Sequence, residues 1–403
     1  MVMKADIPKG YKQTEVGVIP EDWDTATLQD ICVENGMVRG PFGGSLKKQF
    51  FVRDGIKVFE QKHAIYKSVE IGSYFITESK FNELKRFEVR GGDFIISCSG
   101  TIGRIYQIPE DAPEGIINQA LLKIETDNNK IDDRYFSYYF EWEDFQNRII
   151  ESTQGGAMKN LVGMDVFRNT TIPLPPTIKE QQAIAEALSD VDGLIGSLDG
   201  LIAKKRQVKQ GTMQQLLTGK RRLPGFSGEW EERKLGDFLD YEQPTNYLVK
   251  DTEYNDNNQI PVLTAGKSFI LGYTYEAFGV FTELPVIIFD DFTTASKYVD
   301  FPFKAKSSAM KMLVPKNDKV HIRFIYEIMQ LIKFPVGDHK RHWIGAYQHV
   351  DITVPSPEEQ GSIAKVLGDM DTEIRGIEQE RDKYKAIKQG MMQNLLTGRI
   401  RLI

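Results

Sequence analysis

The chain has 403 residues, of which 41% are hydrophobic and 27% are charged, with a formal net charge of −6. This composition is ordinary for a globular protein, and the length indicates two to four folding units. The longest apolar runs, such as residues 286–289, fall far short of the roughly 20 residues that cross a bilayer, so we expect no association with a membrane.

The cysteines and the N-terminus indicate the compartment. Cys32 and Cys98 lie far apart and form no disulfide framework, and residues 1–6 lack the apolar core of a signal peptide, so we expect a cytoplasmic protein. The acidic total argues only weakly against nucleic acid, because binding depends on where the basic side chains gather. Basic clusters occur at residues 204–206 and 339–342.

The first 175 residues are expected to form a mixed α/β domain. It opens with the motif Pro20-Glu21-Asp22-Trp23. Strand-like runs at residues 93–96, 116–117 and 121–124 alternate with glycine turns, and a helix is expected over residues 133–151. Short strands joined by glycine loops suit a scaffold that presents loops to a ligand.

A repeat of about forty-five residues then defines a helical segment over residues 176–222. Residues 209–219 read KQGTMQQLLTG and residues 388–398 read KQGMMQNLLTG, an offset of 179 residues that continues upstream without a gap to Pro176 and Pro355. Thr177 is a plausible N-cap of the first copy, with Glu180 placed as in a capping box. Ser356 and Glu359 take these positions in the second copy.

An apolar seam with a period of 3.5 residues runs along each copy and then turns polar. The seams consist of Ile184, Leu188, Val191, Ile195, Leu198 and Ile202 in the first copy and of Ile363, Leu367, Met370, Ile374 and Ile377 in the second. So narrow a seam requires a partner helix, and the other copy is the best candidate, in an antiparallel coiled coil with pseudo-two-fold symmetry. The alternative is two amphipathic helices in an ordinary core. Gly219 and Gly398 are expected to cap the helix ends in a left-handed conformation.

The second half repeats the plan, with an α/β domain over residues 223–354 and a helical segment over residues 355–403. A weaker echo of the tryptophan motif, Gly228-Glu229-Trp230, stands near the start of this domain. A strand-like run follows at residues 285–289, and a helix is expected at residues 319–333. The fold class is therefore α+β, with two α/β domains separated by two long helices.

We find no signature of catalysis and expect no catalytic residue in this chain. Residues 263–268 resemble the end of a P-loop, but Pro261 stands where the first glycine is required. The chain lacks the Asn-Pro-Pro-Tyr type of tetrapeptide with which amino-methyltransferases hold a flipped base, and no glycine-rich fingerprint for S-adenosylmethionine is visible. We expect the chain itself to bind no cofactor.

No metal site is expected either. His339, His342 and His349 have no cysteine nearby. The pair Asp290-Asp291, followed by Lys297, could belong to a nuclease metal site, but a turn at a strand end explains it better.

Several motifs resemble those of the specificity subunits of type I restriction-modification enzymes, and the resemblance covers nearly the whole chain. They are Ile19-Pro20-Glu21-Asp22-Trp23, Ser99-Gly100-Thr101-Ile102-Gly103, Met158-Lys159-Asn160-Leu161, Ile172-Pro173-Leu174-Pro175-Pro176, Glu180-Gln181-Gln182-Ala183-Ile184 and Gln214-Gln215-Leu216-Leu217-Thr218-Gly219. The second half, with Tyr241-Glu242-Gln243-Pro244-Thr245 and Phe289-Asp290-Asp291-Phe292, looks like one recurrent type of recognition domain.

The resemblance implies a non-catalytic DNA-binding subunit. In that family the α/β segments are target-recognition domains that each read one half of a split site on double-stranded DNA. The paired helices space these domains and dock two modification subunits, which methylate adenine N6 with S-adenosylmethionine. Two motor-nuclease subunits, which use ATP and magnesium, can join. Methylation requires a flipped base, so the reader must hold the duplex while its partner extrudes the adenine.

Candidate DNA contacts are exposed Arg, Lys and Ser side chains on loops. We select Arg39, Lys47, Lys48, Arg104 and Lys159 in the first domain, and Lys304, Lys306, Ser307, Ser308, Lys311, Lys340 and Arg341 in the second. A solvated surface charge is the alternative for each. Trp343 could stack on a base or pack in the core, and residues 204–206 could contact phosphate or form a solvated helix face.

Two other functions compete with the specificity subunit. A self-contained restriction-methylation enzyme would bind its cofactor as an isolated chain. A coiled-coil scaffold of another protein assembly would show no salt-dependent affinity for DNA.

Overall fold

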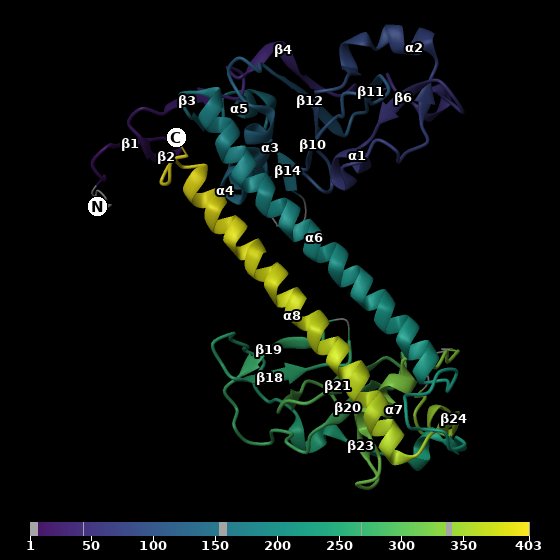
Figure 1. The fold of residues 1–403 in the computed structure, drawn as a ribbon. Coiled ribbons are helices and arrows are strands. Elements are labelled where there is room, and N and C mark those ends of the chain that lie inside the picture. Colours follow the sequence, from purple (N-terminus) through teal and green to yellow (C-terminus); the bar gives the residue numbers. More distant parts are fainter. Residues whose placement is uncertain (1–6, 43, 153–158, 267, 336–340, 403) are drawn as a thin grey trace. The chain divides into compact units, whose positions relative to one another are not determined.

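The structure, a computed structural model, describes residues 7–42, 44–152, 159–266, 268–335 and 341–402. The chain divides into two compact units, one of residues 1–197 with 381–403 and one of residues 198–380. Each unit contains one α/β domain, the beginning of one long helix and the end of the other (Figure 1).

The two long helices, α6 (Ile178–Leu216) and α8 (Pro357–Leu395), have 39 residues each and occupy equivalent positions in the repeat. Their N-termini carry the expected caps, since the backbone N–H of Glu180 lies 3.2 Å from Thr177 Oγ1 and that of Glu359 lies 3.5 Å from Ser356 Oγ. Gly219 and Gly398, just beyond the helix ends, have φ angles of +66° and +69°. This left-handed conformation costs glycine little, as expected from the sequence.

The first unit holds many short strands and helices. The strands are β1 (Tyr11–Thr14), β2 (Gly17–Pro20), β3 (Asp24–Thr27), β4 (Cys32–Arg39), β5 (Phe51–Val52), β6 (Ile56–Phe59), β7 (Phe75–Ile76), β8 (Glu88–Val89), β9 (Phe94–Ser97), β10 (Ile105–Gln107), β11 (Gly115–Ile117), β12 (Leu121–Thr126), β13 (Ile150–Ser152), β14 (Lys159–Leu161) and β15 (Thr171–Leu174). The short helices are α1 (Gln61–Tyr66), α2 (Glu78–Glu83), α3 (Asp133–Glu141), α4 (Glu143–Ile149) and α5 (Met164–Arg168).

The second unit has fewer elements. They are β16 (Glu231–Lys234), β17 (Leu239–Glu242), β18 (Ile260–Leu263), β19 (Ile270–Thr274), β20 (Val286–Asp290), β21 (Ser296–Val299), β22 (Lys304–Ala305), β23 (Met310–Pro315), α7 (Ile322–Met329) and β24 (Asp351–Val354). The helix expected over residues 319–333 is thus shorter, and the one expected over residues 133–151 is two helices, because Trp142 between α3 and α4 is extended.

The two α/β domains share a common arrangement of strands, to which the first domain adds others such as β5 and β8. A four-stranded antiparallel sheet has the order β10-β9-β12-β4 in the first and β21-β20-β23-β17 in the second. In the second sheet of each domain, β6 pairs with β7 and β11 just as β18 pairs with β19 and β22, with the second pairing of each set parallel. The strand pairs β3–β15 and β16–β24 also correspond. The duplication therefore extends through the α/β domains, where the sequences themselves show little similarity.

In each unit, one of the hydrophobic cores contains residues of the domain and of both long helices. In the first unit, Leu188 of α6 and Leu395 of α8 pack with Trp23 and Phe140 of the domain. In the second unit, Leu216 of α6 and Leu367 of α8 pack with domain residues such as Phe324. Since the start of one helix meets the end of the other in each unit, the helices run antiparallel. The expected α+β class with two long paired helices is confirmed.

Candidate nucleic-acid interface

The predicted DNA contacts of the first domain are distributed over three of its sheets. Arg39 ends β4 and is half-buried, and Arg104, just before β10, is exposed. Lys47 and Lys48 are exposed in and beside a short 3₁₀ helix. Lys159 belongs to β14, but its side chain lies outside the described residues. The described members of this set thus keep basic side chains at the surface of one domain.

In the second domain, four of the predicted contacts face solvent at least in part. Ser307, Ser308 and Arg341 are exposed, while Lys306 is half-buried with its Nζ 5.5 Å from the centre of the Tyr254 ring. Lys340 lies outside the described residues. These positions stay predictions of DNA contact.

Lys304 and Lys311 are corrections to the predicted set. Lys304 is fully buried, with its Nζ 2.8 Å from Glu276 and 2.7 Å from the carbonyl oxygen of Phe278. Lys311 is also buried, and its Nζ lies 3.5 Å from Asp291. A buried cation that already has a carboxylate partner offers no charge to phosphate. Both lysines alternate with apolar residues, a pattern that predicts a side chain facing solvent, so their burial leaves no signal in the sequence.

The structure also places Trp343 and the acidic pair of this domain. Trp343 is buried against Phe289 with ring centres 5.3 Å apart, so it belongs to the core. Asp290 accepts the backbone N–H of Phe292 at 2.8 Å, which supports the turn interpretation of the acidic pair. Within the described ranges, no group of three or more His, Cys, Asp or Glu side chains is placed to hold a metal ion. His339 lies outside those ranges.

The seam residues make two kinds of contact, with an α/β domain and with the other helix. Ile184 and Leu188 are fully buried in the core of the first unit, as are Ile363 and Leu367 in the second. The other buried members are Leu198, Ile202 and Ile374, and the half-buried members are Val191, Ile195, Met370 and Ile377. The beginning of each seam therefore packs against an α/β domain as well as against the other helix. Packing against a domain is what the ordinary-core alternative predicts.

An arginine that follows each long helix forms an ion pair with a glutamate at the start of the other helix. We call this contact an arginine clasp. In the first unit, Arg401 Nε lies 2.5 Å from Glu180 Oε1, and its Nη1 lies 2.8 Å from Asp22 Oδ1. The Arg401 guanidinium also lies over Trp23, 5.6 Å from the ring centre. The hydrogen bond from Arg401 lowers the pKa of Asp22 below its ordinary value. These contacts give a structural role to Asp22 and Trp23 of the first tryptophan motif and to Glu180 at the start of α6.

The second unit repeats this clasp with the equivalent residues. Arg222 Nε lies 2.6 Å from Glu359 Oε1, and the Arg222 guanidinium lies 5.6 Å from the centre of the Trp230 ring. Arg222 and Arg401 occupy equivalent positions in the repeat, as do Glu359 and Glu180. The sequence showed that these residues recur, and the structure shows that they pair with each other.

A second ion pair recurs further along the helices. Lys388 Nζ lies 2.7 Å from Asp192 in the first unit, and Lys209 Nζ lies 2.7 Å from Asp371 in the second. In the second unit Arg323 of α7 also bonds to Asp371. The polar interruptions of the two seams are therefore ion pairs between the helices.

The cluster at residues 204–206 is partly neutralised. Lys205 Nζ lies 2.6 Å from Glu373, and Arg206 pairs with Glu378. Both carboxylates belong to α8, so the cluster stabilises helix pairing, and phosphate contact remains open only for the exposed Lys204.

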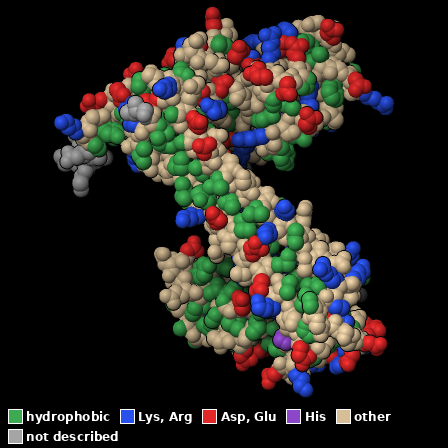
Figure 2. All heavy atoms as spheres, viewed as in Figure 1, with side chains coloured by type: hydrophobic (Ala, Val, Ile, Leu, Met, Phe, Trp, Pro, Cys, Tyr) green, Lys and Arg blue, Asp and Glu red, His purple; other side chains and the backbone are tan. Residues whose placement is uncertain are grey.

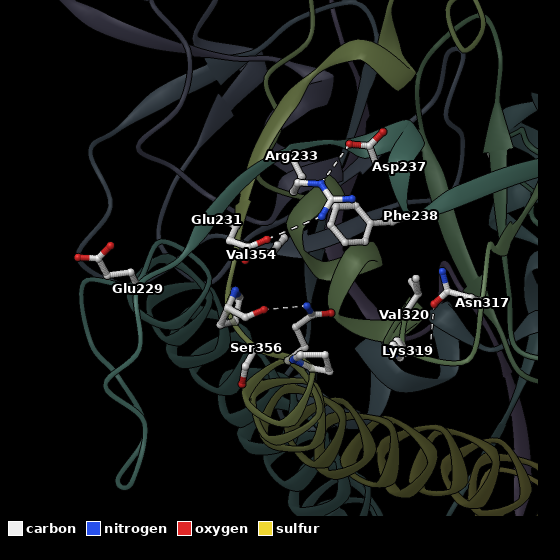
Figure 3. A pocket seen from close by; sticks show the side chains of 13 residues that line it. Glu229, Glu231, Arg233, Asp237, Phe238, Asn317, Lys319, Val320, Val354 and Ser356 are labelled. Atoms are coloured by element: carbon white, nitrogen blue, oxygen red, sulfur yellow. Dashed lines mark hydrogen bonds and ion pairs between the residues drawn. The ribbon is translucent and has the colours of Figure 1, made fainter.

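The joint between domain and helix carries a pocket in each unit, with carboxylates at its rim. The pocket in the second unit has a volume of about 310 Å³, and Figure 3 shows Arg233 there between Glu231 and Asp237, at 3.7 and 3.4 Å. Its counterpart in the first unit, of about 920 Å³, is lined by Asp24 and Asp30 among others. Carboxylates repel phosphate, so we do not place DNA in these pockets.

No continuous basic field covers the visible surfaces of the units. On the face drawn in Figure 2, Lys and Arg side chains are interspersed with Asp and Glu.

Comparison with known proteins settles the family. The model of the type I restriction modification DNA specificity domain matches residues 20–204 and 227–388, which is most of the chain and both halves of the duplication. The chain belongs to this family. It is a DNA specificity subunit and not the catalytic subunit of such an enzyme.

Curated relatives and solved structures agree with this assignment. The type I restriction enzyme EcoR124I/EcoR124II specificity subunit of Escherichia coli is 48% identical over 157 residues, which cover 36% of this chain and 38% of that protein. The putative type I restriction enzyme MjaX specificity subunit of Methanocaldococcus jannaschii is 24% identical over 98% of this chain and 97% of its own length. The S subunit of a type I restriction-modification system from M. genitalium has the same fold, with a TM-score of 0.58, 16% identity and coverage of 93% of this chain and 96% of that one.

Among the described helices, none combines the length and the apolar character needed to span a membrane. Burial raises the pKa of the Cys32 thiol to about 12 and that of the Cys98 thiol to about 11, so both thiols stay protonated at neutral pH. Neither cysteine is therefore suited to act as a nucleophile.

Proposed function

We propose that this specificity subunit directs a type I complex to a bipartite DNA site, with each α/β domain reading one half-site. The observation that carries the proposal is the common topology of the two domains, whose loops differ in sequence. One scaffold presenting two different loop sets suits the recognition of two different short sequences. The paired helices that join the domains fix the gap between the half-sites, much as dimer geometry fixes operator spacing.

The modification subunits are proposed to dock on the paired helices. Val208 of α6 and Ile387 of α8 are 50% and 39% exposed, although they are apolar and occupy equivalent positions in the repeat. Val208 borders a groove of about 450 Å³ lined also by Leu223, Pro224 and Val366. Two equivalent apolar positions suit a partner that is present in two copies.

In this proposal the chemistry belongs to the partners. The modification subunits bind S-adenosylmethionine and methylate adenine N6, and two motor-nuclease subunits that use ATP and magnesium add cleavage of unmodified DNA. The specificity subunit supplies the DNA contacts, including Arg104 and Arg341, that hold the duplex in register while the target adenine is flipped out.

Mapping methylated adenines tests the proposal. The chain is co-expressed with the modification subunit encoded beside it, and the methylated positions are read by single-molecule sequencing. We expect a bipartite motif with a fixed gap that disappears when this chain is omitted. A continuous motif, or methylation that does not depend on the chain, would contradict the proposal and favour the scaffold alternative.

A further inference from the structure

The β20–β21 hairpin of the second domain occupies a distinctive place in the fold. It joins the edge strand of the four-stranded sheet to its neighbour, as the β9–β10 hairpin does in the first domain. The connecting loops have unrelated sequences, Cys98-Ser99-Gly100-Thr101-Ile102-Gly103-Arg104 in the first domain and Asp291-Phe292-Thr293-Thr294-Ala295 in the second. One sheet position thus carries two different loops, as expected where the two domains read different sequences.

A buried carboxylate anchors the loop of the second domain. Asp291 is 2% exposed, and its Oδ1 accepts the backbone N–H of Trp343 at 2.8 Å while its Oδ2 lies 3.5 Å from Lys311 Nζ. The carbonyl oxygen of Asp291 also accepts the N–H of His342 at 2.9 Å. A buried ion pair adds little net stability, so a role in holding a geometry is a more natural explanation.

The tip of the loop is also held in one conformation. Asp290 Oδ1 accepts the N–H groups of Phe292 and Thr293, and the carbonyl oxygen of Asp290 accepts that of Thr294 at 2.9 Å. Thr294 has a φ of +59°, a left-handed conformation that β-branched residues rarely adopt. Such strain persists where the surrounding structure fixes it, and it concentrates at functional sites.

The side chains that this rigid tip presents are suited to base edges. Phe292 is 38% exposed and Thr293 is exposed. Arg341, next to the anchored residues His342 and Trp343, is exposed as well. An aromatic ring can contact a thymine methyl group or a base face, a hydroxyl can bond to any base, and arginine suits guanine. The loop of the first domain exposes a similar set, namely Ser99, Thr101 and Arg104.

We propose that the β20–β21 loop, through Phe292 and Thr293, reads bases of the second half-site, and that Asp291 is the positioning residue that holds it. The β9–β10 loop takes the equivalent role in the first domain. This inference rests on the proposed function, and it adds residues that the sequence analysis did not select. It also assigns a function to the buried ion pair between Asp291 and Lys311, which the packing of the domain core does not need.

The test measures discrimination at each half-site separately. Duplexes carrying the mapped site, or single-base substitutions in one half, are methylated by the chain in complex with its modification subunit, and kcat/KM is compared between them. For Phe292→Ala and Thr293→Ala we expect discrimination in the second half-site to fall roughly tenfold or more, with the first unchanged. For Thr101→Ala and Arg104→Ala we expect the reverse.

Tyr275→Ala is the matched control, because Tyr275 is an exposed aromatic residue of the same domain, 69% exposed, away from the hairpin in sequence. This variant should leave both half-sites unchanged. The inference fails if Phe292→Ala and Thr293→Ala alter neither half-site, or both equally, while the wild-type complex reads both. A wild-type complex that discriminates at neither half-site would instead overturn the proposed function, and the inference with it.

Asp291→Asn tests the positioning role. A loss of folded protein lowers methylation of matched and mismatched duplexes by the same factor, whereas a displaced loop changes their ratio. We expect the ratio to fall for the second half-site only, measured at a temperature where circular dichroism shows the variant to be folded. An unchanged ratio would reduce Asp291 to a structural residue and contradict the proposed anchor.

Discussion

The Lys304 ammonium lies 2.8 Å from Glu276 inside the second domain, where both side chains are almost inaccessible to solvent. Replacing Lys304 by methionine leaves the Glu276 carboxylate buried without its charge partner. We therefore expect Lys304→Met to lower the free energy of unfolding by about 3–5 kcal/mol, as measured by urea denaturation.

Lys306 is the matched control, two residues away and half-buried at the surface. Lys306→Met should change stability by less than about 0.5 kcal/mol, and if Lys306 contacts phosphate it should reduce the salt dependence of DNA binding. Equal destabilisation by the two variants would contradict the distinction between an internal and a surface lysine.

Glu276 also makes the stability of the second domain depend on pH. Burial alone would raise the pKa of Glu276, but hydrogen bonds from Lys304 and from the backbone N–H groups of Asp251 and Lys250 lower it below its ordinary value of 4.5. A carboxylate with a lowered pKa stabilises the folded state above pH 4.5, and this contribution is lost as the pH falls below that value. In Glu276→Gln, stability should fall less steeply below pH 4.5, as followed by fluorescence during acid titration. If the stability of this variant falls as steeply below pH 4.5 as that of the wild type, the proposed contribution of Glu276 is contradicted.

The paired helices are joined by ion pairs that are equivalent in sequence but differ in surroundings. Asp371 is 24% exposed and serves both Lys209 and Arg323, whereas Asp192 is 41% exposed and pairs with Lys388. Asp371→Asn leaves two partly buried cations with less compensation, so we expect it to cost roughly 3 kcal/mol, against about 0–1 kcal/mol for Asp192→Asn. Thermal unfolding of the two variants measures the difference, and equal losses would argue against it.

Sequence and structure agree on the helices because their signals are local. Proline boundaries, caps at Thr177 and Ser356 and a gapless repeat define both helices to within a few residues. The clasps of Arg401 and Arg222 join residues more than a hundred positions apart, and no local pattern states such a pairing. The same holds for the anchor of Asp291, whose partner Trp343 lies 52 residues away.

The exposure of individual basic side chains was the least predictable feature. Composition selects Lys304, Lys306 and Lys311 equally, but whether each points outward depends on its position in the sheet. Phe292, an aromatic residue beside a strand, resembles a core residue in sequence. Its exposure follows from the turn that Asp290 and Thr294 build.

For the molecule as a whole, the duplication predicts exchangeable parts. Both α/β domains have the same strand order and are attached to the helices through equivalent arginine clasps. Replacing one α/β domain while keeping the clasp residues should therefore preserve helix pairing and partner docking. Only the DNA sequence that this domain reads should change.

The exposed apolar residues Val208 and Ile387 allow the proposed docking of the modification subunits to be tested. We expect Val208→Asp and Ile387→Asp together to weaken binding of the modification subunits, because a carboxylate would be buried in each contact. Native mass spectrometry of the co-purified complex should show fewer modification subunits per chain, with each single variant losing one of the two. Lys365→Asp, at an exposed position of α8, is the control and should leave the stoichiometry unchanged.

The most direct test of the central claim, that each domain reads its own half-site, is a methylation map of a chimera. Residues 235–350, which lie between the strands of the β16–β24 pair, are replaced by the corresponding segment of another specificity subunit, and the chimera is co-expressed with the modification subunit. The account predicts that one half of the bipartite motif changes while the other half and the gap stay the same. A motif that is unchanged, or that changes in both halves, would contradict it.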